Sequence, residues 1–516
     1  MAIINRIDRK FRERILLLLL CICAVADTPV ALAASSNDDS PVELSQDNLP
    51  VVPPQEESAP ESVLIAAAGD LPRITDPAQA GDRIEELTTQ ILLKEIQLEK
   101  FNLNYKLNAA KQGRWKGWRY AFFNEANAGM GIAGGIIGTQ QRGSHIHRSN
   151  KVKNYIQQNA NYIPMIGSII AASAAVLEFS INEYHEYEAF KKGFSPGKAK
   201  EYVNNLKNEI SRMMYERDAL VKLEESAPLL TERAEIENLE GKVLRDIRDQ
   251  SLLEYQRFHL AARRLLAFQQ CQYMFDFSKN TTNAIGLAFG YLALHRRRRP
   301  WNFKAGVLFD VSGALTMAGP IVSRLYAKSI HEYHKRYTKD TIQDAEAREC
   351  AVLEADQKAL DALCKLRRDG SPTSLARVDR GAIYVEHSKI FQDEVEKASK
   401  DLDKAKLVAT QNIGASMYVG GSKLASGILF TIPGYLQLYN NGKTQDSSRV
   451  TNHLLFASGV VGLPASTFSL LDTLRIQVQG ERNRHKLAAQ GKLPAQLIKE
   501  RLAQLDAMEA RLKGNK

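Results

Sequence analysis

The hexapeptide Ser-Ile-Asn-Glu-Tyr-His at Ser180–His185 recurs as Ser-Ile-His-Glu-Tyr-His at Ser329–His334, with five of six positions identical at an offset of 149 residues. Each copy follows an apolar run rich in Gly, Ala and Ser, at Tyr162–Phe179 and Ala305–Ser323, and precedes a charged helical pattern. A third apolar run, Leu454–Leu471, aligns with the second. The sequence therefore predicts an all-α fold of three repeated units, each an apolar Gly/Ala-rich helical hairpin with long amphipathic, coiled-coil-like helical arms.

Changes of composition divide the chain into segments. We expect a signal peptide at 1–33 and a disordered, acidic, Pro-rich linker at 34–80, because the linker carries too little apolar surface to offset its ordering entropy. Repeat units follow at 81–225, 226–369 and 370–516, with their hairpins at 120–179, 281–323 and 413–471.

The N-terminus has the three parts of a secretory leader. A basic stretch, Met1–Arg14, precedes the apolar segment Ile15–Ala26, and small residues suited to cleavage end at Ala26 and Ala33. The alternative is an uncleaved anchor. Cleavage would leave three cysteines, an odd number that argues against a disulfide framework and favours small core residues.

Composition limits the class of protein. The hydrophobic fraction is 44% and the mean hydropathy is −0.30, so most of the chain faces water and bilayer segments are a minority. The net charge of +10 could suggest nucleic acid, but the basic cluster Arg296, Arg297, Arg298 and Arg299 lies between two apolar runs. That position favours a topology determinant or a contact with anionic lipid, and we expect no nucleic-acid partner.

Bilayer insertion is expected from length and topology together. A spanning helix needs about 20 mostly apolar residues, and Leu454–Leu471 comes near this without a charge. A signal peptide would place the mature N-terminus outside, so all hairpin turns would face the cytoplasm, and the turns at 140–153 and 295–304 are strongly basic. The alternative is a Gly/Ala-packed core inside a soluble exported helical bundle.

Four ionisable residues lie in or beside the apolar runs. If those runs are in lipid, such groups are costly and usually mark a polar pathway or a paired site; in a soluble bundle they would stand at interfaces or helix ends. We expect Asp310 and Lys423 to be the pair to test first. The intramembrane polar candidates are Glu125, Glu178, Asp310 and Lys423.

The repeated hexapeptide is interpreted as an interfacial anchor with tyrosine at headgroup level. A metal site is less favoured, because His331 and His334 share a helix face but lack the second His that a zincin helix requires. No catalytic, metal or cofactor site is expected. The residues of the repeated interfacial motif are Glu183, Tyr184, His185, Glu332, Tyr333 and His334.

These observations predict an exported protein of the cell envelope, embedded in a membrane with most of its mass extracytoplasmic. The predicted function is structural: the arms bind protein partners or form a homo-oligomer, and the chain organises a membrane or scaffolds a complex. The main alternative is a pore or transport component built from the hairpins, and a soluble exported helical bundle is the second. No enzymatic activity is expected.

Overall fold

The chain divides into two compact units, Met1–Arg73 and Ile74–Lys516. Our computed structural model describes part of the second unit: residues 77–109, 114–148, 154–226, 231–296, 300–343, 345, 350–366, 380–381, 383–384, 414–436, 445–490 and 493–514. The predicted signal peptide, almost all of the predicted linker and Arg297, Arg298 and Arg299 lie outside these residues, as does the Arg296 side chain.

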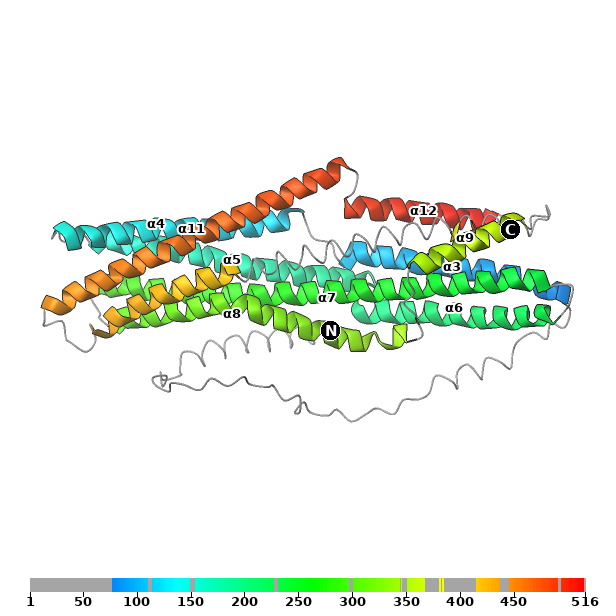
Figure 1. The fold of residues 1–516 in the computed structure, drawn as a ribbon. Helices are drawn as coiled ribbons and strands as arrows, with labels where there is room; N and C mark the ends of the chain where they lie inside the picture. The colour runs from blue at the N-terminus through cyan, green and yellow to red at the C-terminus, as the bar shows by residue number, and fades with distance from the viewer. Residues whose placement is uncertain are drawn as a thin grey trace, which may run out of the picture. The chain divides into compact units, whose positions relative to one another are not determined.

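The described residues form helices joined by turns and contain no strand, which confirms the all-α prediction. The threefold repeat and its division into hairpin units stay predictions. The helices are α3 (Pro77–Ala109), α4 (Arg114–Arg148), α5 (Asn154–Lys191), α6 (Pro196–Glu225), α7 (Thr231–Arg296), α8 (Pro300–Tyr337), η1 (Asp340–Ile342), α9 (Cys350–Leu366), an unlabelled helix at 414–436, α11 (Gln445–Ala489) and α12 (Pro494–Gly514) (Figure 1).

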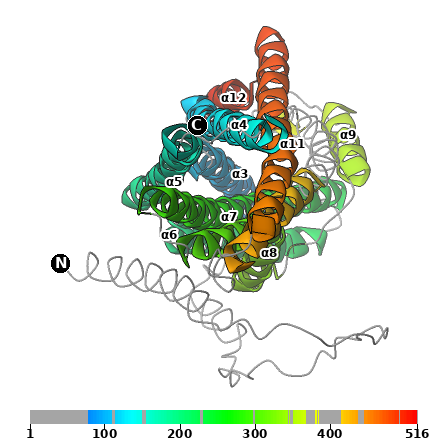
Figure 2. The ribbon, with the colours of Figure 1, turned by 90° about the vertical axis from the view of Figure 1, so that its left-hand side faces the viewer.

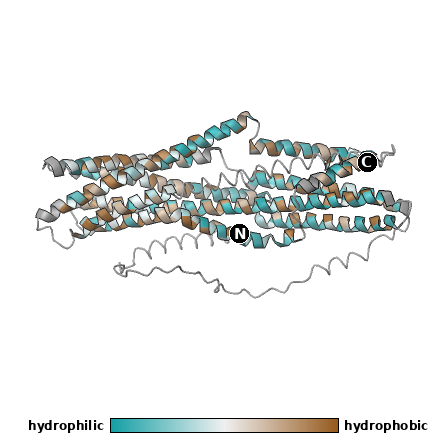
Figure 3. Cartoon of the chain, viewed as in Figure 1, coloured by the Kyte–Doolittle hydropathy of each residue, from teal (hydrophilic) through white to brown (hydrophobic). Residues whose placement is uncertain are grey.

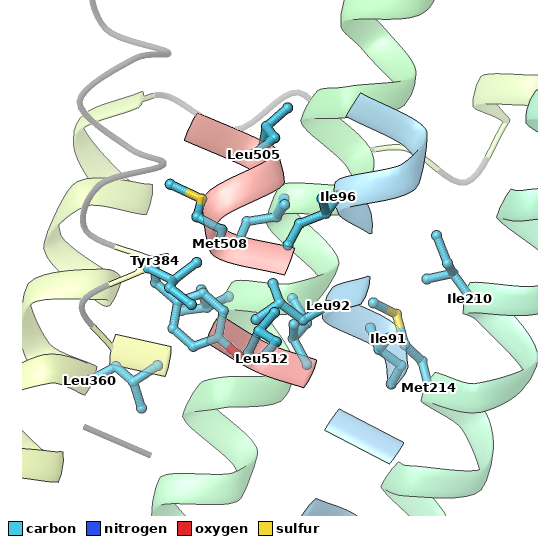
Figure 4. Close-up of a cluster of buried hydrophobic side chains, with 14 of the residues drawn as sticks. Ile91, Leu92, Ile96, Ile210, Met214, Leu360, Tyr384, Leu505, Met508 and Leu512 are labelled. Atoms are coloured by element: carbon cyan, nitrogen blue, oxygen red, sulfur yellow. The ribbon is translucent and has the colours of Figure 1, made fainter. Parts of the chain in front are cut away.

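One group of helices, here called the arm bundle, consists of α3, α6, α9, α12 and the N-terminal part of α7. Its core collects the apolar stripe of each amphipathic helix, and Figure 4 shows Ile91 and Leu92 of α3 near Met214 of α6 and Leu512 of α12. A second cluster contains aromatic rings among aliphatic side chains: the Tyr105 ring centroid lies 5.8 Å from that of Tyr255 and 5.5 Å from that of Phe258. In the sequence, apolar residues recur at 3,4 spacing, as at Ile84, Leu87 and Ile91, and this spacing predicts such faces because residues so spaced share one side of a helix.

The sequence Ser195-Pro196 predicts an N-cap followed by proline at the first helical position, and α6 starts in this way. Ser195 has an extended backbone and its side chain accepts a hydrogen bond from the Lys198 backbone N–H, while Pro196 occupies the first helical turn. Gly193 just before it has a φ of +84°, a left-handed conformation that glycine adopts without a steric penalty. The reversal from α5 into α6 is therefore encoded locally.

The sequence pattern predicts one arm helix from Pro228 to about Phe277 and another from Arg324 to about Leu366, and the structure contradicts both boundaries. The arm helix predicted to end near Phe277 continues through the apolar run to Arg296, so α7 is one helix of 66 residues. Conversely, the helix predicted from Arg324 to Leu366 ends at Tyr337, and α9 starts at Cys350. In α7, Gly286 and Gly290 do not interrupt the helix, since α8 and α5 pack against them.

The apolar helices form a closed sequence of contacts, here called the helix ring. α4 packs on α5, α5 on α7, α7 on α8, and α11 on α4. The helix at 414–436 completes the ring: Gly313 of α8 lies against its Leu424 backbone, and its Ser426 donates to the Ser458 carbonyl of α11 with an O···O distance of 2.9 Å. Figure 2 views this ring end-on, with α5, α4, α11, α8 and α7 around it.

The contact between α8 and the helix at 414–436 is a glycine seam. Gly306 and Gly313 of α8 lie against the backbones of Thr431 and Leu424, and a Cβ at either glycine would come 2.6 Å from a backbone atom. In return, Gly420, Gly427 and Gly434 lie against the backbones of Met317, Asp310 and Phe303. The glycines on both helices recur every seventh residue and the pairing runs antiparallel. The two backbones therefore meet along a line where no larger residue fits.

The outer surface of the ring is apolar. Exposed side chains include Ile169 and Val176 on α5, Ile285 on α7, and Ile428 and Ile432 on the helix at 414–436. Figure 3 shows more hydrophobic colour over the end of the unit with α4, α8 and α11, and more hydrophilic colour over α3, α6 and α12. Three described segments are long and apolar enough to cross a membrane: Ile156–Glu225, which contains most of α5 and all of α6, Trp301–Tyr337 and Val450–Ala489.

Candidate functional site: a polar cavity in the helix ring

A cavity of about 610 Å³ lies inside the helix ring and is lined by residues of all six of its helices. Its lining is rich in amides and hydroxyls, in contrast to the aliphatic outer surface of the same helices. The polar uncharged lining residues include Asn124, Asn127, Gln157, Asn161, Ser168, Asn280, Asn283, Ser312, Thr316, Ser416, Ser426, Ser458, Ser466 and Ser469.

The cavity runs lengthwise along the ring. Its lining residues extend along α4 from Tyr120 to Arg142, a helical rise of roughly 33 Å at about 1.5 Å per residue. On α11 they extend from Ser458 to Gln477, roughly 29 Å by the same measure. The hydrocarbon core of a bilayer is about 30 Å thick. The polar lining and a membrane interior therefore match in length.

Four of these side chains form a hydrogen-bond relay between α5, α4 and α7. Asn283 Nδ2 donates to Ser168 Oγ over 2.8 Å, and Ser168 Oγ donates to Asn127 Oδ1 over 3.5 Å. Asn127 Nδ2 then donates to Asn280 Oδ1 over 3.3 Å. Asn280 is 3% exposed, and its own Nδ2 is buried without a partner. The relay thus ends in an amide donor that lacks an acceptor.

The charged side chains of the lining are Arg142, Asp276, Lys279, Lys423 and Asp472. Asp276 forms an ion pair with Lys279 over 2.5 Å and accepts a hydrogen bond from the Tyr120 hydroxyl. Arg142 Nη1 donates to the Leu455 carbonyl over 2.6 Å, and its guanidinium lies over the Phe430 ring. Both groups are thereby held in place.

Lys423 lies in this cavity, and no ion pair joins it to Asp310. Asp310 faces the glycine seam, where its Oδ2 accepts a hydrogen bond from Thr431 Oγ1 over 2.9 Å. The charged groups that act on the Lys423 ammonium are Lys279 and Asp276. The two residues belong to different faces of neighbouring helices, a separation that spacing along the sequence could not reveal.

The other two polar candidates belong to α4 and α5. Glu178 is 1% exposed, and its Oε1 accepts from Arg119 Nε over 2.6 Å. Glu125 has a buried Oε1 without a hydrogen-bond partner. Neither lines the cavity. The side chains of Arg296, Arg297, Arg298 and Arg299 lie outside the described residues.

The two copies of the hexapeptide place their tyrosines alike. Tyr184 on α5 and Tyr333 on α8 are each 64% exposed. The two copies of the motif differ elsewhere: Glu183 accepts a hydrogen bond from Gln270, Glu332 is exposed, and His185 lies 3.8 Å from a Glu188 oxygen. Exposed tyrosine at both positions fits an interfacial anchor, which stays a prediction.

His334 takes part in a cluster that the sequence did not indicate. Its Nδ1 lies 3.1 Å from His259 Nε2, and His259 Nδ1 lies 2.9 Å from the Tyr105 hydroxyl. These residues come from α8, α7 and α3. Within the part of the chain described, no group of three or more His, Cys, Asp or Glu is arranged to hold a metal ion. The cluster joins the arm bundle to the end of α8.

A scan against protein-family models, a search of curated proteins and a search of solved structures each found no match to this chain.

Proposed function

We propose that this chain is a membrane protein that acts as a pore or transport component, with the cavity of the helix ring as its passage for small polar solutes. The observation that carries the proposal is the inverted polarity of the ring. Amide, hydroxyl and ammonium groups lie in its interior beside glycines and apolar side chains such as Phe309, whereas its outer surface exposes aliphatic side chains such as Ile285 and Ile432. This arrangement suits helices that stand in lipid around a wet interior.

The same arrangement is unfavourable for a soluble bundle. Polar groups buried in a protein core without hydrogen-bond partners cost free energy, and large exposed apolar patches promote aggregation. Among the described residues, Asn280 and Gln157 line the cavity, and each has a buried side-chain atom, Asn280 Nδ2 and Gln157 Oε1, without a hydrogen-bond partner. Water or solute in the cavity would supply those partners, and lipid would cover the outer surface.

The proposed membrane topology is inferred from the sequence. A leader at the N-terminus and basic turns between the apolar helices favour extracytoplasmic arms, with the turns on the cytoplasmic side. Cysteines placed at Tyr215 in α6 and at Arg297 test this: an impermeant thiol reagent applied from outside should label position 215 alone. Labelling of position 297 alone from that side would reverse the topology.

The flux test uses purified protein in liposomes and small neutral solutes, with stopped-flow light scattering as the readout. Proteoliposomes should admit glycerol faster than empty liposomes. A Ser416→Trp variant places a bulky ring in the cavity lining and should reduce the flux, whereas Met417→Trp, at an exposed neighbouring position, should not. The absence of flux for every solute tried would refute the proposal.

A scaffold that organises a membrane or a complex is the second candidate. The C-terminal part of α11 favours it, because Leu471, Leu474 and Val478 are exposed there. A second copy of the chain could cover them. Cysteine at Leu474 should then form a disulfide between copies in native membranes, and strictly monomeric protein in membranes would count against this role.

A further inference from the structure

The cavity has an excess of positive charge that its own residues do not neutralise. Asp276 is already bound to Lys279 and to the Tyr120 hydroxyl, and Asp472 lies 3.5 Å from Arg475. The Lys423 ammonium has no hydrogen bond or ion pair with any residue that the structure describes. A lysine in such a place favours an anionic ligand, because charge attraction is strong away from bulk water.

A second feature of the cavity independently points to the same ligand chemistry. In the relay from Asn283 to Asn280, the two middle groups, Ser168 and Asn127, each accept a hydrogen bond from the preceding residue and donate one to the next. The last donor, Asn280 Nδ2, is buried and unpartnered. Hydrogen-bonded groups in a row polarise one another, which strengthens the terminal N–H as a donor. Its missing partner is an acceptor, such as an oxyanion oxygen.

We propose that the cavity binds a small organic oxyanion, a carboxylate or a phosphate ester, through the Lys423 ammonium and the Asn280 amide. Charge-assisted hydrogen bonds to such oxygens are stronger than hydrogen bonds between neutral groups. The volume of about 610 Å³ lies within the range of pockets for small organic molecules. The remaining hydroxyls and amides of the lining suit a ligand that also carries hydroxyl groups. This inference names a substrate class for the proposed passage and therefore rests on the proposed function.

The flux experiment compares matched pairs of solutes in proteoliposomes: gluconate against sorbitol, and glycerol 3-phosphate against glycerol. At least one anion should pass roughly ten- to a hundredfold faster than its neutral partner, as expected for a charge-assisted contact. A preference for gluconate over sorbitol would indicate a carboxylate ligand, and a preference for glycerol 3-phosphate over glycerol would indicate a phosphate ester. Lys423→Gln should abolish the preference while neutral flux continues, and Lys423→Arg should retain it. Lys304→Gln, at an exposed position of α8, is the matched control and should leave the preference unchanged.

Binding to the detergent-solubilised protein separates the two proposals. Isothermal titration with gluconate and with glycerol 3-phosphate should give affinities that Lys423→Gln and Asn280→Ala each weaken at least tenfold. Neutral flux without any anion preference or anion binding would overturn the oxyanion site and leave the pore intact. Lys423-dependent anion binding without flux of any solute would overturn the pore and leave the oxyanion site intact. Anion binding that survives Lys423→Gln unchanged would also overturn the assignment.

Discussion

At the scale of single residues, the arm bundle contains a buried ionic network around Glu240 of α7. Its Oε1 accepts hydrogen bonds from Arg380 Nε and from the Tyr384 hydroxyl, each over 2.9 Å, and Arg217 Nη2 lies 3.7 Å from Oε2. Burial alone would raise the pKa of Glu240, but Arg380 and Arg217 hold that pKa below its ordinary value. The network links α7 to α6 and to Arg380 and Tyr384.

Removal of Arg380 should destabilise the arm bundle strongly. Arg380→Ala leaves the Glu240 carboxylate buried with an incomplete set of partners, for which we expect a loss of about 3–5 kcal/mol in the free energy of unfolding. Urea titration followed by circular dichroism in detergent measures this loss. The double variant Arg380→Met with Glu240→Gln removes both charges and should be more stable than Arg380→Ala. A single variant as stable as wild type would contradict the account of the network.

His259 gives the arm bundle a defined pH response. Burial, together with His334 and Arg263, lowers its pKa to about 3, whereas an unfolded chain has a histidine pKa of about 6.5. Below about pH 6.5 the unfolded chain therefore binds a proton that the folded chain does not bind. The contribution of His259 to the free energy of unfolding is therefore fully present above about pH 6.5. It decreases by about 1.4 kcal/mol per pH unit as the pH drops toward 3.

In the variant His259→Asn, this pH dependence of the free energy of unfolding should be lost. Asparagine can still hydrogen-bond Tyr105 but does not titrate, so between pH 4 and 6.5 its free energy of unfolding should depend less on pH than that of wild type. Urea titrations of both proteins at several pH values measure the difference. Identical slopes would show that His259 is not buried as described.

At the scale of elements, the glycine seam determines how α8 meets the helix at 414–436. A Cβ at Gly420 would come 2.8 Å from the Met317 backbone N, whereas a Cβ at the adjacent Gly421 would meet no atom within 4 Å. The two positions form a matched pair on one helix. Gly420→Ala should separate the helices and cost about 1–3 kcal/mol, as overpacking does.

Gly421→Ala should be neutral or slightly stabilising, because alanine favours helix over glycine by up to about 1 kcal/mol. The thermal midpoint of each variant in the same detergent measures both effects. If Gly420→Ala and Gly421→Ala shift the midpoint equally, the backbones do not meet at this seam.

The existence of the helices could be predicted from the sequence, but not their full extent. The 3,4 spacing around Ile84, Val203 and Val243 predicted helices that α3, α6 and α7 confirm. The join within α7 was missed because the change from amphipathic to apolar composition near Phe277 resembles a boundary. A helix crosses such a change without a break when each part finds its own neighbours, α6 on one side and α8 on the other.

At the scale of the whole described unit, one prediction was confirmed in coarse form: three helices could cross a membrane. The cavity was not predictable, because its lining combines residues from six helices that are far apart in the sequence. Lys423 was selected as an isolated charge in an apolar run, but the relay residues Asn127, Asn280 and Asn283 were not. Those amides come together only because α4 and α7 are packed in the helix ring.

The central claim is that the helix ring stands in lipid with a wet interior, and thiol accessibility tests it most directly. In a background without native cysteines, Asn283→Cys faces the cavity and Ile285→Cys is exposed on the outer surface of the same helix. In proteoliposomes, a small, charged, water-soluble thiol reagent should modify position 283 and leave position 285 unmodified. Rapid modification of position 285 with protection of position 283 would mean a soluble bundle with a dry core, and would contradict the account.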